Sequence, residues 1–249
     1  MRSFDLGQLL CPVTIEEFIG TRYEKTLLHV SRGGNADYYS NLFSLDAVDE
    51  FLHVVKPAYT KAFALDSRRK IEVAEYSAAD GLADPLRLFD LYDSGATIVL
   101  KEIEGHCPSL QALCRSAEKR SSFPFVATAF LSPPQGQCFP IHFDAKDIFV
   151  TQISGSKNWR FFRPQYELPL SHQHCYDGMA EQDFLEEVDL ASWRFFVFSS
   201  RLSAPGSSFH GHVPPPPQWP GNPGGPGHGV HGLVVHPGPI NGVVITPER

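Results

Sequence analysis

"FPIHFDAKDIFVTQISGSKNWRFF", residues 139–162, places a histidine and an aspartate two positions apart, directly before a long apolar run. Because alternate side chains of a strand share one face, His142 and Asp144 would point the same way and could bind one ion between them. An imidazole and a carboxylate suit a borderline divalent metal, and with one more histidine they make the facial triad that holds Fe(II). The alternative is a surface turn after Pro140, because His-x-Asp also occurs by chance.

Composition and charge limit the classes of protein. The chain has 249 residues, of which 42% are hydrophobic, enough for one domain of ordinary size with a buried core. Its net charge of −7 argues against a nucleic-acid partner, and the densest basic run, "DSRRK" at 66–70, is interpreted as a solvated turn. Five dispersed cysteines are typical of reduced thiols. The sequence shows no signal peptide and no apolar run of about 20 residues, so we expect a soluble, cytoplasmic protein without membrane contact.

The order of the expected elements indicates the fold class. Helical spacing with capping residues is followed, from Phe123, by short strand-like runs separated by Pro, Gly, Ser and Asn. Helices followed by many short strands predict a β barrel or sandwich with a helical preface. The expected helices lie at 15–25, 44–55, 84–95 and 109–120, and the expected strands at 26–32, 71–76, 96–103, 123–132, 147–154, 158–163 and 186–190.

The region around the His-x-Asp pair carries further motifs. They are Ser132-Pro133-Pro134, Gly136, Asp147-Ile148-Phe149 through Gln152, and Gly155-Ser156-Lys157-Asn158-Trp159. Together with His142 and Asp144 this pattern resembles the cupin-like Jumonji-C (JmjC) family, in the branch that contains the ribosomal-protein hydroxylases. The resemblance covers roughly residues 8–190.

The resemblance implies a mainly β fold, a double-stranded β-helix of the cupin or jelly-roll type. We expect an N-terminal α/β preface at 1–95 and the barrel core at 96–200. Residues 201–249 are expected to form a Pro/Gly/His-rich, disordered tail, because they contain almost no charged residues and many helix- and strand-breaking ones.

The implied activity is that of an Fe(II)- and 2-oxoglutarate-dependent oxygenase. In such an enzyme His142 and Asp144 would hold the iron, and Lys157 would bind the far carboxylate of 2-oxoglutarate. Thr128 falls where relatives often place a polar side chain near the co-substrate, and Trp159 is expected in the core. The implied substrate is a protein side chain or a small metabolite. The oligomeric state is left open.

The third metal ligand is missing from its expected place. The family has a histidine about sixty residues after the first, in a motif G-D-x-x-Y-x-P-R-G-x-x-H, and this chain has Ala204 there. His210 is the tentative substitute, with His212 beside it. Two other readings stay open: a non-catalytic cupin-fold binding module that has lost the ligand, and a metal-dependent cupin of the isomerase type, which would need further ligands near His142.

The tail also suggests a cause for the missing motif. Codons for "WRFFVFSSRLSAP" can be chosen so that the next frame encodes "GDFLYFPRGFPH", the expected motif in its expected place. We therefore hypothesise a change of reading frame between about Asp189 and Trp193. This hypothesis predicts that residues from about 204 onward pair with no strand of the barrel, and the coding DNA around codon 190 would test it.

Overall fold

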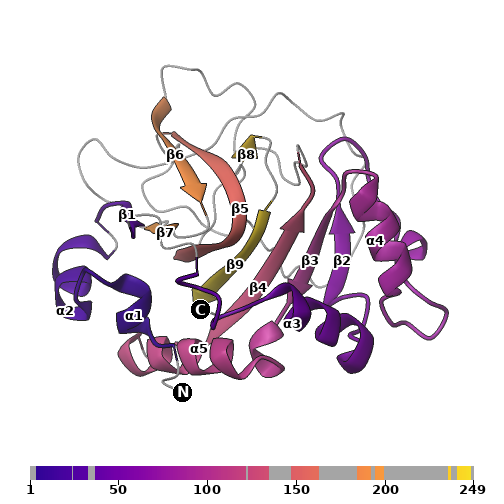
Figure 1. Cartoon of the computed structure of the whole chain (residues 1–249), viewed down its shortest axis with the longest axis horizontal. Coiled ribbons are helices and arrows are strands. Elements are labelled where there is room, and N and C mark those ends of the chain that lie inside the picture. Colours follow the sequence, from indigo (N-terminus) through magenta and orange to yellow (C-terminus); the bar gives the residue numbers. More distant parts are fainter. Residues whose placement is uncertain are drawn as a thin grey trace.

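The structure is a computed structural model of the whole chain (Figure 1). It describes residues 4–23, 25–32, 37–121, 123–134, 147–162, 184–191, 194–198, 235–236 and 240–247. His142, Asp144 and His210, the metal ligands proposed from the sequence, lie outside these described residues.

The helices of the described part begin where the sequence offers capping side chains. Thr14 accepts a hydrogen bond from the backbone N–H of Glu17, and Ser44 from that of Ala47, as expected for N-caps. Asp84 caps a helix that has a proline in its first turn. The α-helices are α1 (Leu6–Leu10), α2 (Ile15–Glu17), α3 (Leu45–Glu50), α4 (Pro85–Asp93) and α5 (Pro108–Ser121); π turns η1 (Phe18–Arg22) and η2 (Phe51–Val55) extend α2 and α3, and 3-10 turns are η3 (Val73–Glu75) and η4 (Ile103–Gly105).

Antiparallel strands form one large sheet with a smaller one attached to it. The large sheet has the order β1-β7-β5-β9-β4-β3-β2, and β6 and β8 pair with β5 outside this order. The strands are β1 (Leu28–Ser31), β2 (Ala62–Leu65), β3 (Thr97–Lys101), β4 (Phe125–Ser132), β5 (Ile148–Phe162), β6 (Phe184–Ala191), β7 (Arg194–Phe198), β8 (Val235–His236) and β9 (Ile240–Pro247). The curled antiparallel sheets agree with the predicted jelly-roll fold.

β5 belongs to both sheets. Its first half pairs with β7 and β9, and residues 156–162 pair with β6. At the junction the register with β9 shifts between Gln152 and Ser154, and Gly155 has a φ of 71°, which favours glycine. The sequence predicted a turn at Gly155-Ser156 between two strands. The structure instead shows one bent strand, because glycine can turn the backbone without breaking the ladder.

The C-terminal segment corrects a second prediction. Residues from about 204 onward were expected to pair with no strand, yet Ile240–Pro247 lies between β4 and β5 and pairs with both. Val235–His236 pairs with Asn158 and Trp159. The expectation is therefore wrong for β8 and β9. The physical reason is local: "INGVVITP" holds β-branched residues in succession, which favour a strand whatever precedes them.

The outer face of the large sheet is covered by the helices. α5 packs on β4, and α4 packs on β2 and β3. In Figure 1 α5 lies below the ends of β4 and β9, whereas β6 and β8 lie at the opposite side of the picture. The hydrophobic core formed here, which we call the outer cluster, includes Leu100, Ala129, Phe149 and Phe195 from the sheet and Leu113 from α5.

The inner face of the large sheet packs against the small sheet. The hydrophobic residues between them, which we call the inner cluster, are Ile148, Val150, Trp159, Phe161, Val188, Leu190 and Phe196. The large sheet therefore has one hydrophobic cluster on each face. This is expected for a curled sheet that is covered by helices on the outside and by a second sheet on the inside.

The strand predicted for "IEVAEY" is wrong: Val73–Glu75 is a 3-10 turn, started by Glu72, whose side chain and that of Glu75 form a reciprocal cap. Such local side-chain bonds compete with strand pairing.

Of the helices in the described part of the chain, none combines the length and the apolar character of a membrane-spanning segment.

Candidate functional site

Lys157 lies inside the fold, on the inner face. It stands opposite Leu190 of β6, and its side chain is only 4% exposed. Trp159, two positions later, shares its face, and the Lys157 Nζ lies 5.6 Å from the centre of the Trp159 ring. Because Leu190 and Trp159 are members of the inner cluster, the lysine ammonium is buried between the two sheets.

Thr128 faces the same space from β4, two strands away from β5 in the large sheet. Directly paired residues of neighbouring strands point to the same face. The register pairs Thr128 with Val244, Val244 with Val150, and Val150 with Phe196. Since Val150 and Phe196 belong to the inner cluster, Thr128, 8% exposed, also lies on the inner face.

The inner face contains two buried polar atoms that lack a hydrogen-bond partner. The indole Nε1 of Trp159 is a donor and the amide Oε1 of Gln152 is an acceptor, and neither has a partner in the described structure. Gln152 is fully buried and Trp159 is 6% exposed. Buried polar groups are nearly always paired, so each of these atoms calls for an explanation.

A buried carboxylate on the outer face fixes the start of β5. Asp147 is 1% exposed, and the hydroxyl of Tyr23 donates a hydrogen bond of 2.5 Å to its Oδ2. The two residues are far apart in sequence, so this bond ties the N-terminal preface to the strand that carries Lys157. Asp147 also directly follows the segment that contains Asp144.

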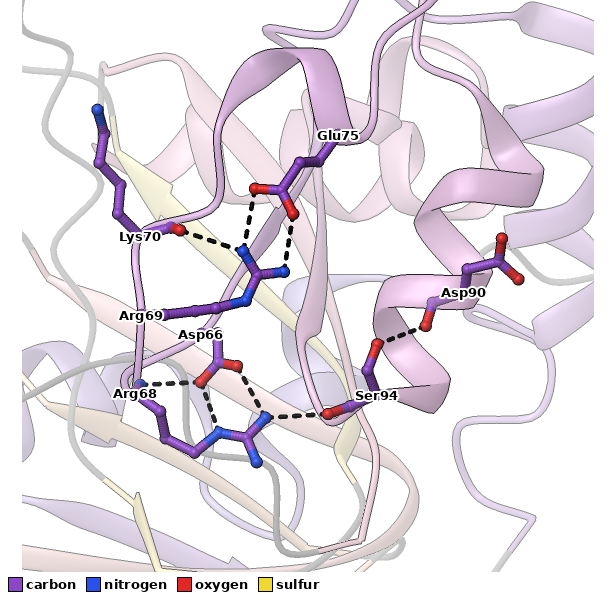
Figure 2. Close-up of polar contacts among 7 residues, drawn as sticks. All are labelled: Asp66, Arg68, Arg69, Lys70, Glu75, Asp90 and Ser94. Carbon is purple, nitrogen blue, oxygen red and sulfur yellow. Dashed lines mark hydrogen bonds and ion pairs between the residues drawn. The ribbon is translucent and has the colours of Figure 1, made fainter.

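The basic run at 66–70 forms a separate polar cluster at the surface (Figure 2). Arg68 donates to both carboxylate oxygens of Asp66, at 2.9 and 2.7 Å, and to the carbonyl oxygen of Ser94. Arg69 donates to Glu75 at 3.0 Å. Hydrogen bonding to Asp66 raises the pKa of Arg68. The Arg68 and Arg69 side chains are exposed, which agrees with the interpretation as a solvated turn. Because each of these guanidinium groups pairs with a carboxylate, the cluster offers little charge to a phosphate backbone.

The sequence-predicted residues are thus partly brought together. Lys157 and Thr128 share the inner face, whereas His142, Asp144 and His210 lie outside the described residues. Within those residues, no group of three or more His, Cys, Asp and Glu side chains is arranged to bind a metal.

Sequence reasoning missed two polar atoms. Trp159 was expected in the core, where it lies, but its N–H was not considered. Gln152 appeared only as part of a motif. The signal was present in the spacing: Gln152 is three residues after Phe149 and two after Val150, so a strand must turn it to the inner face.

Comparison with known proteins shows that part of the chain resembles one family. Residues 108–192 match the model of the JmjC domain. A bifunctional lysine-specific demethylase and histidyl-hydroxylase NO66 from Drosophila pseudoobscura pseudoobscura is 30% identical over 167 residues, which cover 66% of this chain and 17% of the relative. Ribosomal oxygenase 1 from Danio rerio is 29% identical over 159 residues, which cover 64% of this chain and 29% of that protein. The chain therefore spans less than a third of the length of these relatives.

Solved structures agree on the fold. An X-ray structure of Escherichia coli ycfD matches 95% of this chain and 52% of its own, with a TM-score of 0.52 and 12% identity. A crystal structure described as E. coli ribosomal oxygenase YcfD matches 94% of this chain and 50% of its own, with a TM-score of 0.51 and 13% identity. Similarity at this level of identity supports the jelly-roll fold.

Proposed function

We propose that this protein is an Fe(II)- and 2-oxoglutarate-dependent oxygenase. The match to the JmjC domain and the similarity to the ribosomal oxygenases support this proposal. The names of the relatives describe a lysine demethylase and a histidyl-hydroxylase, which supports a protein side chain as the substrate; a small metabolite is the alternative. Because the chain spans only part of those relatives, activity and substrate are proposed for it and not transferred.

The observation that carries the proposal is the pair of donors on the inner face. Lys157 Nζ and Trp159 Nε1 come from one strand and one face, and both are buried. The far carboxylate of 2-oxoglutarate offers only acceptors, so it can take a charge-assisted bond from the ammonium and a second bond from the indole N–H.

The metal would be held by His142 and Asp144, with His210 as the substitute third ligand. An imidazole nitrogen and a carboxylate oxygen are donors that suit Fe(II) and leave positions open for other ligands. Bound iron would supply the activation of dioxygen. In this proposal Lys157 and Trp159 orient the co-substrate, and the inner cluster excludes water from the space between the sheets.

The experiment is succinate formation from 2-oxoglutarate with Fe(II). We expect slow turnover, because a site with two secure ligands binds iron weakly, and we expect His142→Ala to remove the remaining rate. Lys157→Met should raise the KM for 2-oxoglutarate. Lys101→Met is the matched control, because Lys101 pairs with Thr128 on the same face of the sheet but packs over Phe63. An equal effect of the two lysine variants would contradict the assignment.

One observation favours the second candidate, a non-catalytic binding module. Ala204 stands where the family has its distal histidine. A binding module would bind 2-oxoglutarate but form no succinate, even when residues after Leu190 are replaced by "GDFLYFPRGFPH". The oxygenase proposal predicts that this replacement restores turnover. If succinate formation is instead already fast and His210→Ala abolishes it, the tail supplies the third ligand.

A further inference from the structure

The side-chain amide of Gln152 has a fixed orientation. Its Nε2 donates a hydrogen bond of 2.8 Å to the carbonyl oxygen of Ser154. A carbonyl can only accept, so the amide cannot be flipped without losing this bond and setting two oxygens against each other. Among the described residues, Oε1 is therefore the atom that is left without a hydrogen-bond partner, in a residue with no exposed surface.

The place of Gln152 in the sheet directs this oxygen toward the space between the sheets. Ile148, Val150 and Gln152 alternate along β5, and the first two belong to the inner cluster. Leaving a buried acceptor unpaired costs about 1–3 kcal/mol. An apolar residue of similar size at position 152 would avoid this free-energy cost. A role in binding therefore accounts for the amide better than a role in stability.

2-Oxoglutarate cannot supply the missing partner. At neutral pH it carries two carboxylates and a ketone, all of which are acceptors. The donors Lys157 and Trp159 suit such a ligand, and the acceptor of Gln152 does not. The inner face therefore presents two complementary regions, one for an acceptor ligand and one for a donor ligand.

The neighbouring strand places a glycine beside Gln152. Gly242 of β9 pairs with Gln152 on one side and with Phe130 of β4 on the other. A glycine places no side chain between its two neighbours. An incoming side chain could therefore lie between the amide and the aromatic ring of Phe130, which is 9% exposed.

We propose that Gln152 is a specificity-determining residue that accepts a hydrogen bond from an N–H group on the substrate side chain. This rests on the proposed function and narrows its substrate to side chains with a nitrogen donor. A site with a buried polar group rejects analogues that lack the complementary donor, because the group is then left unpaired.

The test measures binding of capped peptides Gly-Gly-X-Gly-Gly by NMR titration in saturating 2-oxoglutarate. X is histidine or lysine in the donor peptides, and leucine or norleucine in the matched peptides without a donor. We expect the wild-type protein to bind a donor peptide about tenfold more tightly than its match, the equivalent of about 1.4 kcal/mol. In Gln152→Met the preference should fall to about twofold or less, because this variant removes the acceptor and keeps the length of the side chain.

The control is the double variant Thr97→Val with Ser132→Ala. These hydroxyls lie 2.7 Å apart and satisfy each other on the same sheet, so their removal should leave the preference unchanged. Equal binding of both peptide types by the wild-type protein, no binding of either, or a preference that survives in Gln152→Met would overturn the proposal. Binding of 2-oxoglutarate is recorded in the same samples: its absence would count against the proposed function, whereas loss of the peptide preference alone would count against Gln152.

Discussion

The buried polar groups on the two faces of strand β5 differ in their hydrogen bonding. On the outer face, the carboxylate of Asp147 has a hydroxyl donor from Tyr23. On the inner face, Gln152 Oε1 and Trp159 Nε1 have no hydrogen-bond partner in the described part of the chain, and the ammonium of Lys157 is buried beside the Trp159 ring. Both faces are equally hidden from solvent, so burial alone does not explain the difference. The outer face is completed by the chain itself, and we propose that a ligand completes the inner face.

The largest effect should come from the apolar core of the outer face. Phe149 packs its ring near those of Phe18, Phe125 and Phe195, with centroids 6.0, 5.9 and 6.3 Å away. We expect Phe149→Ala to lower the free energy of unfolding by about 3–5 kcal/mol, because it leaves a cavity in a packed region. Urea denaturation followed by circular dichroism measures this. A loss as small as that of Phe149→Leu would show that the outer cluster contributes little.

The second-largest effect should come from the hydrogen bond between Tyr23 and the carboxylate of Asp147. Tyr23→Phe removes the hydrogen bond to Asp147 and should lower the free energy of unfolding by about 1.5–3 kcal/mol, the range for bonds to charged groups. Tyr38→Phe is the matched control, because the Tyr38 hydroxyl donates to a neutral carbonyl, that of Gln8, at 2.6 Å. The same denaturation assay should give a smaller loss for Tyr38→Phe. The reverse order would contradict the role assigned to Asp147.

On the inner face, a comparable change should cost far less stability. Lys157→Met removes a buried charge, and the relief of its desolvation offsets the contacts that are lost. We expect the free energy of unfolding to change by less than about 1 kcal/mol. If unfolding measurements show a loss as large as that of Tyr23→Phe, Lys157 is mainly a structural residue.

The smallest effect concerns pH. Burial, with Glu104 and Glu118 nearby, raises the pKa of Cys114 to about 12, above its ordinary value of 9.0. Between these values the unfolded thiol ionises and the folded one does not, so stability falls as pH rises above about 9. We expect Cys114→Ala to flatten this decline in thermal unfolding curves. Peptide mapping after alkylation at pH 8 should label exposed Cys11 well before Cys114; equal labelling would argue against the burial of Cys114.

The sequence predicted those parts of the fold that depend on local patterns. The caps at Thr14 and Ser44, the helix at 108–121 and the central strand around Phe149 follow from spacing and capping, and alternation along β5 would have turned Gln152 inward. The bend at Gly155 could not be distinguished from a turn, because glycine permits both and tertiary pairing decides between them.

The C-terminal strands were the main failure. The Pro/Gly-rich composition of residues 201–249 masked a short β-branched run at its end, and the pairing of Ile240–Pro247 with β4 is a long-range contact that local reasoning does not reach. β7 is a related case. Phe195 and Phe196, which follow the hypothesised frame change, are fully buried on opposite faces of the large sheet. The frame-change hypothesis remains a prediction about the coding DNA.

The most direct test of the ligand-binding inner face is calorimetric titration of the purified protein with 2-oxoglutarate. We predict saturable binding by the wild-type protein, a loss of affinity of about tenfold or more in Lys157→Met, and a smaller loss in Trp159→Phe, since a charge-assisted bond is stronger than a neutral one. Lys101→Met should bind as the wild type does. No binding by the wild-type protein, or equal affinity of the wild type and Lys157→Met, would contradict the account.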